Sequence, residues 1–479
     1  MQMKNTKVFF HHFIYTFSSN FFKLIFHVII ILIMPKLIGV TEYSYFQYYT
    51  LLSNYIVYFH FGWCDGIYLR YVGINYKNYQ KKIISNQFWG SCLWGLSISM
   101  IILTFIAVLP LDLDRKWIFL WLALLTAIVI PQIMLSVILQ ASSRLKESSQ
   151  MILIEKNIYG FFLLLITGLG VRQYRYMILG DILGRVTSLG FGMYTCRDII
   201  FHKCGIDIKK FKEEVKKNFQ VGIFLLVANL TGVLITGIPQ FFIENKWGIN
   251  AFGYISFSLN LSKMIMIVIN SISIILVPFF RNSSEDKLRQ IYPKINSILM
   301  VILFGILLVY YPLRGILIYW LPEYQLSIKY LALLFPVCLF ESKTAMLLNT
   351  YLKALREEKK MCIGNVATVG ISFMISVINI YTSNSLTVTI VGIPVFLAIR
   401  KIILEFLIDR RLKIVKWKDS VIEIALSVIF MIVSWKYHGW ISMIIYFCSA
   451  CGYFYYKREV IRYLWNLLKQ KWNKSLEVQ

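Results

Sequence analysis

The sequence lacks the motifs that would supply nucleotide hydrolysis or metal-dependent catalysis. No Gly-Lys dipeptide occurs in its 479 residues, which excludes a P-loop and a built-in ATPase of that kind. An HExxH motif and the paired CxxC pattern of a structural zinc site are also missing. We therefore expect no cofactor and no metal, and we interpret the protein as a non-enzyme.

Charged residues are scarce as well, at 15% of the chain, whereas 58% of the residues are hydrophobic and the mean hydropathy is +0.64. A soluble domain could not bury this much apolar surface, so the composition indicates a polytopic membrane protein. The net charge of +26 is distributed over short segments between apolar runs. That pattern is typical of membrane topology, and we expect no nucleic-acid partner.

The eight cysteines include one CxxC pair, Cys448 and Cys451, a spacing that can bind metal or carry redox chemistry. This pair lies inside an apolar run and no second pair accompanies it. We interpret both cysteines as ordinary helix residues.

A membrane-spanning helix needs about 20 mainly apolar residues, and the chain contains about fourteen such runs. The first is too long for a signal peptide and has no small-residue cleavage site, so we expect it to be retained. The predicted spans are Phe9–Met34, Tyr43–Gly62, Ile83–Val108, Trp117–Leu139, Met151–Val171, Tyr176–Cys196, Phe219–Ile243, Phe252–Phe280, Ile295–Trp320, Leu326–Leu352, Met361–Tyr381, Leu386–Ile408, Ser420–Trp435 and Trp440–Tyr456.

The segments between these runs alternate in charge. One set holds most of the 50 lysines and arginines and includes Lys203–Lys217, Arg281–Lys294 and Arg400–Lys418. The positive-inside rule predicts that this set and both termini are cytoplasmic. The other set consists of short loops, which leaves no space for a catalytic domain outside the cell.

Two patches suggest an internal duplication. Gly39–Tyr45 resembles Gly248–Tyr254 at an offset of 209 residues, and Arg144–Glu147 resembles Ala354–Glu357 at an offset of 210. Chance similarity between apolar stretches is the alternative. Duplication of a six-helix unit would give two lobes related by an axis along the membrane normal. The predicted domains are residues 1–218, residues 219–418, and two extra helices with a basic tail in residues 419–479.

Three lysines fall near the middle of predicted spans, where a cation costs at least about 2.5–3.5 kcal/mol. The first, Lys23, shares a helix face with three polar residues, and the second, Lys263, lies on a similar polar stripe. A polar stripe on a spanning helix faces protein or water, so we expect both lysines to bind an anionic group. The stripe of Lys23 contains Thr16, Asn20 and His27, and that of Lys263 contains Ser256, Asn260 and Asn270.

The third lysine, Lys343, is also a candidate for anion binding. A structural ion pair is the alternative for all three lysines. Glu341 lies close to Lys343 in sequence, although residues i and i+2 do not face each other on a helix.

Several other charged residues lie within or at the ends of the predicted spans. Asp65 and Arg70 close the second span, where a gate or substrate-entry role competes with simple helix termination. Asp181 and Arg185 have the favourable i, i+4 order of a structural helix pair. Arg314 lies near the outer end of its span, where its side chain can reach the interface, and we interpret it as structural.

The stretch Tyr45-Phe-Gln-Tyr-Tyr49 through Phe61-Gly-Trp-Cys-Asp-Gly-Ile-Tyr-Leu-Arg-Tyr71 resembles bacterial oligosaccharide flippases. These are the O-antigen and capsule repeat-unit transporters of the polysaccharide-transporter family, in the multidrug/oligosaccharidyl-lipid/polysaccharide exporter superfamily. Pro35–Tyr43 and Phe252–Arg281 also fit this family.

The resemblance implies a two-lobed bundle that moves undecaprenyl-pyrophosphate-linked oligosaccharide to the outer leaflet by alternating access. Lys23, Lys263 and Lys343 fall on helices that line the cationic cavity in such proteins. Expected partners are the membrane, the lipid-linked oligosaccharide, and a polysaccharide polymerase and glycosyltransferases of the same pathway. Two alternatives remain open: an exporter of drugs or another lipid-linked precursor from the same superfamily, and a membrane polysaccharide polymerase or ligase.

Overall fold

The computed structural model describes residues 30–202, 208–264, 266, 269, 280, 284–414, 417–437, 439–460 and 462. These residues form helices joined by short connections, with no strand among them. Six of the described helices are long and apolar enough to cross a membrane, and a bent helix pair would make a seventh. The protein is therefore an all-α polytopic membrane protein, as the composition predicts. The total of about fourteen spans stays a prediction, because most of the first run lies outside the described residues.

The chain divides into two compact units, each described here by itself. The N-terminal unit consists of Leu32–Gly237 and Gly248–Gly253. The C-terminal unit contains Ile238–Trp247 and the described residues from Tyr254 onward. The domain limits at residues 218 and 418 stay predictions.

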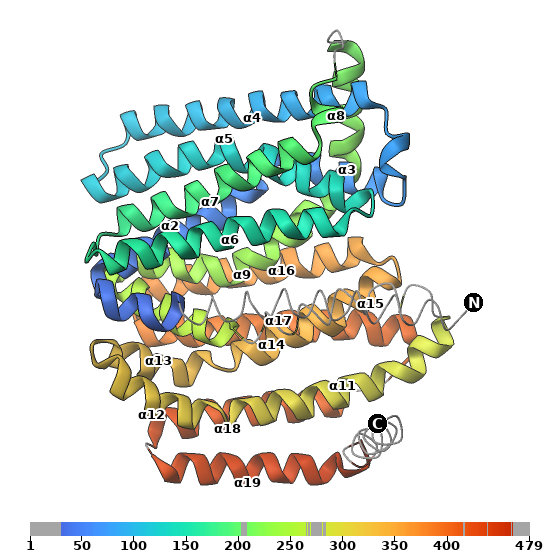
Figure 1. Cartoon of the computed structure of the whole chain (residues 1–479). Helices are drawn as coiled ribbons and strands as arrows, with labels where there is room; N and C mark the ends of the chain where they lie inside the picture. The colour runs from blue at the N-terminus through green and yellow to red at the C-terminus, as the bar shows by residue number, and fades with distance from the viewer. Residues whose placement is uncertain are drawn as a thin grey trace, which may run out of the picture. The chain divides into compact units, whose positions relative to one another are not determined.

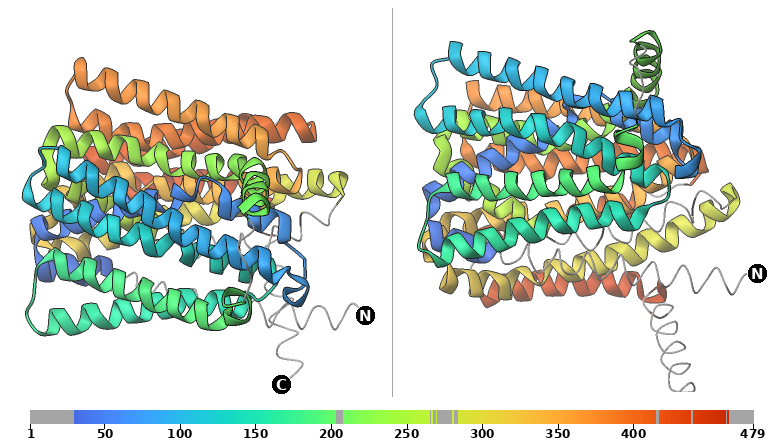
Figure 2. Two further views of the ribbon diagram at one scale, coloured as in Figure 1. Left: turned by 90° about the horizontal axis from the view of Figure 1, so that it is seen from above. Right: turned by 45° about the horizontal axis from the view of Figure 1, so that its top comes forward.

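The N-terminal unit is built from antiparallel helices joined by short turns (Figure 1). The helix α5 is the most deeply buried, with 72% of the residues in its apolar stretch buried. The neighbouring helix α4 lies at the periphery, with 17% of the residues in its apolar stretch buried (Figure 2). The elements are α2 (Val40–Ile56), η1 (Val57–His60), α3 (Trp63–Tyr71), η2 (Tyr76–Asn78), α4 (Lys81–Val108), α5 (Leu113–Ala141), α6 (Leu145–Gly168), α7 (Tyr174–Thr195), α8 (Arg197–Ile200) and the first part of α9 (Ile208–Lys263).

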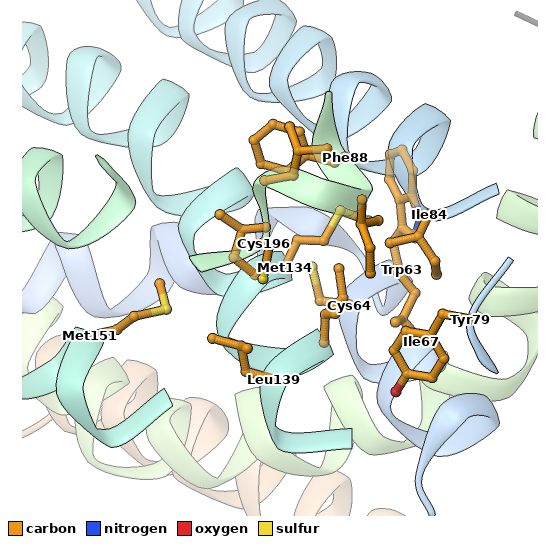
Figure 3. Close-up of a cluster of buried hydrophobic side chains, with 14 residues drawn as sticks. Trp63, Cys64, Ile67, Tyr79, Ile84, Phe88, Met134, Leu139, Met151 and Cys196 are labelled. Atoms are coloured by element: carbon orange, nitrogen blue, oxygen red, sulfur yellow. The ribbon is translucent and has the colours of Figure 1, made fainter. Parts of the chain in front are cut away.

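The core of this unit includes a buried apolar cluster that joins α3 to its neighbours. Trp63, Cys64 and Ile67 of α3 contact side chains that include Phe88 and Met134 (Figure 3). The indole N–H of Trp63 donates to the amide oxygen of Gln87 at 2.9 Å, so the polar edge of this large side chain is satisfied inside the cluster. The cluster fixes α3, the helix that carries Asp65 and Arg70.

The C-terminal unit begins within α9 and continues to the end of the described chain. The backbone of α9 is broken at Gly248, which has φ 83° and ψ 173°. The later elements are α11 (Glu285–Leu307), α12 (Tyr310–Trp320), η3 (Pro322–Tyr324), α13 (Gln325–Leu334), α14 (Val337–Lys343), η4 (Thr344–Leu348), α15 (Asn349–Ala354), α16 (Glu358–Tyr381), α17 (Leu386–Leu412), α18 (Trp417–Lys436) and α19 (Trp440–Tyr456).

The predicted span Leu326–Leu352 is not one straight helix. Pro336 cannot donate a backbone hydrogen bond, and the chain bends by 46° where α13 ends and α14 begins. A π-helical turn, η4, follows directly after Lys343. Such turns insert an extra residue into the helical repeat and are frequent at functional sites. The short helix α14 therefore carries Glu341 and Lys343 between two irregular segments.

The first pair of similar patches also shares its backbone geometry. Gly39, at φ 80° and ψ 172°, has nearly the same dihedral angles as Gly248. This region is accessible almost only to glycine, so both patches need glycine at this point for the same reason. The two patches of the second pair lie at different positions relative to their helices. Arg144 immediately precedes α6, whereas Ala354 is the last residue of α15.

Candidate functional site

The candidate anion-binding residues of the first span lie outside the described residues. These are Asn20, Lys23 and His27, and their predicted role stays a prediction. The remaining candidates, Asn260, Lys263 and Lys343, belong to the C-terminal unit and are described.

Lys343 lies in a buried network of four ionisable side chains. Its ammonium contacts both oxygens of Glu423, at 2.9 and 2.6 Å, and also contacts Glu405. Lys401 completes the network, 2.6 Å from Glu423 and 3.2 Å from Glu405. The side chains of both lysines and of Glu423 have no exposed surface. We call Lys343, Lys401, Glu405 and Glu423 the neutral quartet, because two positive and two negative charges cancel.

Polar side chains complete the surroundings of the quartet. Ser420 donates to Glu405 and lies 3.2 Å from the ammonium of Lys401. The amide of Asn296 donates to Glu423 at 3.4 Å. Buried charges are tolerated when they are paired and hydrogen-bonded on all sides, and this arrangement meets both conditions. The acidic partners of Lys343 are thus Glu405 and Glu423, from α17 and α18, and its neighbour Glu341 points into a different cluster.

That second cluster contains Lys263, at the end of α9. Glu341 acts electrostatically on both Lys263 and the guanidinium of Arg400, which lies 3.7 Å from it. Arg400 also donates to the side-chain oxygen of Asn365 at 2.9 Å. We call Lys263, Glu341 and Arg400 the cationic triad, because two cations share one carboxylate and the formal charges sum to +1.

The polar stripe predicted around Lys263 is present in the described part of α9. Ser256, Asn260 and Lys263 follow each other at spacings of four and three residues, which places them on one helix face. Asn260 and Lys263 are partly exposed, and the hydroxyl of Ser256 is buried without a hydrogen-bond partner in the described residues. Asn270 lies outside the described residues.

The two clusters differ in what they can do chemically. The quartet is compensated internally, so an anion bound there would compete with two carboxylates already in contact with both lysines. The triad contains two cations and one carboxylate, and Lys263 is partly exposed. An anionic group can therefore approach Lys263 more readily than it can approach the buried lysines of the quartet.

Sequence reasoning missed most members of these clusters. Arg400 and Lys401 were grouped with a basic cytoplasmic segment, although the predicted span Leu386–Ile408 already included them. In the structure α17 continues to Leu412 and buries both side chains. A signal was available, because Lys401 and Glu405 are i and i+4 on this helix.

The candidate gate residues lie on α3 in the N-terminal unit, Asp65 in its first turn and Arg70 in its last turn. Arg70 donates to the carboxylate of Glu214 at 2.7 Å and to Asn218 at 2.6 Å, both near the start of α9. Asp65 lies 3.9 Å from the imidazole of His60. Burial alone would raise the pKa of Glu214, but hydrogen bonds from Arg70 and Lys217 outweigh it and lower this pKa. The structure thus ties Arg70 to α9, and a gating role stays a prediction.

The remaining sequence candidates are structural in character. Asp181 accepts from Arg185 at 2.9 Å and from the hydroxyl of Tyr49 at 2.9 Å, which confirms the predicted helix pair. Cys448 and Cys451 are exposed free thiols on α19. No group of metal-ligating side chains occurs among the residues that the structure describes.

The fold is that of transporters of the MOP superfamily. A multidrug resistance MATE family transporter in an inward-facing conformation superposes with a TM-score of 0.64 at 13% identity, over 81% of this chain and 94% of its own. The lipid II flippase MurJ, in an inward closed conformation, gives a TM-score of 0.62 at 14% identity, over 94% of this chain and 100% of its own. At these identities the likeness shows the fold alone.

A family model adds information from the sequence itself. The model described as "Polysaccharide biosynthesis protein" matches residues 70–321, more than half of the 479-residue chain. The chain belongs to this family. No sequence among the curated proteins matches it.

Proposed function

We propose that this protein is a flippase that moves undecaprenyl-pyrophosphate-linked oligosaccharide repeat units from the cytoplasmic to the outer leaflet. The family is one of polysaccharide biosynthesis, and a flippase of a lipid-linked precursor has the same fold. Polysaccharide units assembled on a lipid must cross the membrane, so a transporter fold in this family fits that step. The polysaccharide made from them would be an O-antigen or a capsule.

The observation that carries this proposal is that two cations of the predicted spans, Lys263 and Arg400, are both influenced by the one carboxylate of Glu341. A lipid diphosphate is strongly anionic, and bringing it below the membrane surface requires a compensating cation. Lys263 is the member of the triad that lies on a polar stripe and is partly exposed. We assign Lys263 to the diphosphate, Asn260 to its immediate surroundings and, from sequence alone, Asn20, Lys23 and His27 to the same role.

Lys343 has a different place in the proposal. Its charge is compensated by Glu405 and Glu423, so we propose that it acts through the quartet. The quartet holds α14 against α17 and α18, and Glu341 lies on the same short helix. Lys343 would thus position Glu341, and with it the triad.

The fold alone does not choose between a flippase and a drug exporter, because the MATE transporter matches as well as MurJ does. The presence of Lys263 and Arg400 in predicted spans favours an anionic substrate over cationic drugs. Both termini would be cytoplasmic, in the inner membrane of a bacterium. Energy would come from an ion gradient, the membrane potential or substrate supply, and a polymerase and glycosyltransferases of the same pathway would be partners.

The test in cells is complementation of a flippase-deficient strain that makes defined repeat units. We expect the wild-type protein to restore surface polysaccharide, and the deletion strain to accumulate lipid-linked repeat units on the inner leaflet. Lys263→Ala should fail to complement while Lys436→Ala, a change at an exposed lysine of α18, should complement fully. Full complementation by Lys263→Ala would contradict the assignment of Lys263, and a lack of complementation by well-expressed wild-type protein would contradict the proposed function.

A further inference from the structure

Two adjoining hollows lie in the C-terminal unit, and no residue of the cationic triad borders either of them. The first has a volume of about 280 Å³ and is bordered by charged, polar and apolar side chains from α12, α13 and α18. The second has a volume of about 520 Å³ and is bordered mainly by apolar surface from α12 and α19. Arg314 and Ile318 border both hollows, so the two volumes meet at these side chains.

The smaller hollow is cationic. Arg314 and Lys329 both border it, together with the amide of Gln325 and the hydroxyl of Ser434. Among the described residues that border the two hollows, none is an aspartate or a glutamate. Neither Arg314 nor Lys329 forms an ion pair with a described residue; the ammonium of Lys329 instead lies 4.9 Å from the ring centre of Trp435. Two uncompensated cations therefore share one small volume.

The larger hollow has the character of a site for a hydrocarbon chain. Tyr311, Trp440 and Met443 border it, and Trp440 is 79% exposed. The hydroxyl of Tyr311 lies 3.2 Å from that of Ser434 and donates to the backbone oxygen of Ser442 at 3.0 Å. These hydrogen bonds join α12 to α18 and α19 between the two hollows, so the boundary is held in place. Exposed tryptophan and tyrosine are typical of the membrane interface.

From this juxtaposition we propose that the two hollows together bind one anionic glycerophospholipid. Its phosphodiester lies between Arg314 and Lys329, with the amide of Gln325 available as a hydrogen-bond donor. One acyl chain lies in the hollow bordered by Tyr311, Trp440 and Met443. A zwitterionic lipid is a poorer ligand because its ammonium would face two cations with no carboxylate beside them. Arg314, which the sequence suggested to be only structural, is the residue that joins the head and chain parts of this site.

The test measures lipid binding to the purified full-length protein by native mass spectrometry from detergent micelles. The probes are phosphatidylglycerol, phosphatidylethanolamine and a prenyl diphosphate, each added alone and in competition. We expect one phosphatidylglycerol to bind more tightly than phosphatidylethanolamine, and Arg314→Gln to weaken it about tenfold, as for loss of one charge-assisted hydrogen bond. Lys329→Gln should weaken it similarly, and the control Lys436→Gln should have no effect.

A second variant tests the chain part of the site. Met443→Trp fills the larger hollow and should weaken long-chain phosphatidylglycerol while leaving binding of the free glycerophosphoglycerol headgroup unchanged. Unfolding temperatures of all variants within a few degrees of wild type would show that each is folded. The proposal is overturned if Arg314→Gln binds phosphatidylglycerol as wild type does, if phosphatidylethanolamine binds equally well, or if the prenyl diphosphate displaces phosphatidylglycerol from this site.

Discussion

The ammonium of Lys343 contacts both carboxylate oxygens of Glu423, at 2.9 and 2.6 Å, and neither side chain has any exposed surface. Each lysine of the quartet contacts both glutamates, so every charge has two partners of opposite sign. Removal of one member leaves a buried charge without full compensation, which is far more costly than loss of a surface ion pair.

We therefore predict that Glu423→Gln destabilises the protein by about 3–5 kcal/mol, the usual range for breaking a buried ion pair. The unfolding temperature in detergent measures this effect. Asp286→Asn is a suitable control, since Asp286 is an exposed acid at the start of α11. Equal unfolding temperatures for the two variants would show that the quartet does not stabilise the fold.

The close crossing of α3 and α9 leads to a second prediction. A Cβ atom at Gly66 would collide with the backbone oxygen of Asn218, and one at Gly222 would collide with the backbone oxygen of Gly62. Backbone atoms cannot move aside as a flexible side chain can. Gly66→Ala should cost about 1–3 kcal/mol, the range for overpacking.

The matched control for this change is Gly190→Ala, because an added Cβ at Gly190 in α7 meets nothing within 4 Å. Removing a glycine from a helix interior should stabilise that variant by roughly 0.5–1 kcal/mol. Thermal unfolding of the two variants should therefore shift in opposite directions. A destabilisation of equal size in both would contradict the close helix crossing.

A third prediction concerns pH and the contact between Arg70 and Glu214. The pKa of Glu214 is lowered in the folded protein, so its contribution to stability is complete above the ordinary carboxyl pKa. That contribution is lost as the pH falls through the lowered pKa. At neutral pH the free energy of unfolding of the wild-type protein should exceed that of Glu214→Gln by about 1 kcal/mol. This difference should disappear on acidification. Unfolding temperatures measured across the acidic range would test this, and an unchanged difference between the two proteins would contradict it.

Much of the helical framework could be predicted from the sequence. The ends of α4 and α16 lie within a few residues of the predicted spans Ile83–Val108 and Met361–Tyr381, since long apolar runs define spanning helices directly. The break at Gly248 could be anticipated in part from its similarity to Gly39. Pro336 was a signal for the bend, because proline interrupts helical hydrogen bonding. The π-turn after Lys343 could not be predicted, because hydropathy carries no information on local backbone geometry.

The site was harder to predict, because charge compensation depends on contacts between distant segments. Lys343 and Lys263 look alike in sequence, as single cations in apolar runs. Their difference comes from Glu423, which is 80 residues away from Lys343 in the chain, and from Arg400, which shares Glu341 with Lys263. Glu341 is close to Lys343 in the sequence, whereas in the structure its carboxylate acts electrostatically on Lys263 and Arg400.

The central claim is that Lys263 supplies the positive charge that meets the lipid diphosphate. The most direct measurement follows a fluorescent prenyl-diphosphate oligosaccharide in proteoliposomes, by the fraction that an impermeant reagent can quench over time. We predict that Lys263→Ala slows translocation about ten- to a hundredfold, as expected for loss of a charged contact, with Lys263→Arg retaining most of the rate. Lys263→Ala translocating the lipid at the wild-type rate would contradict the claim.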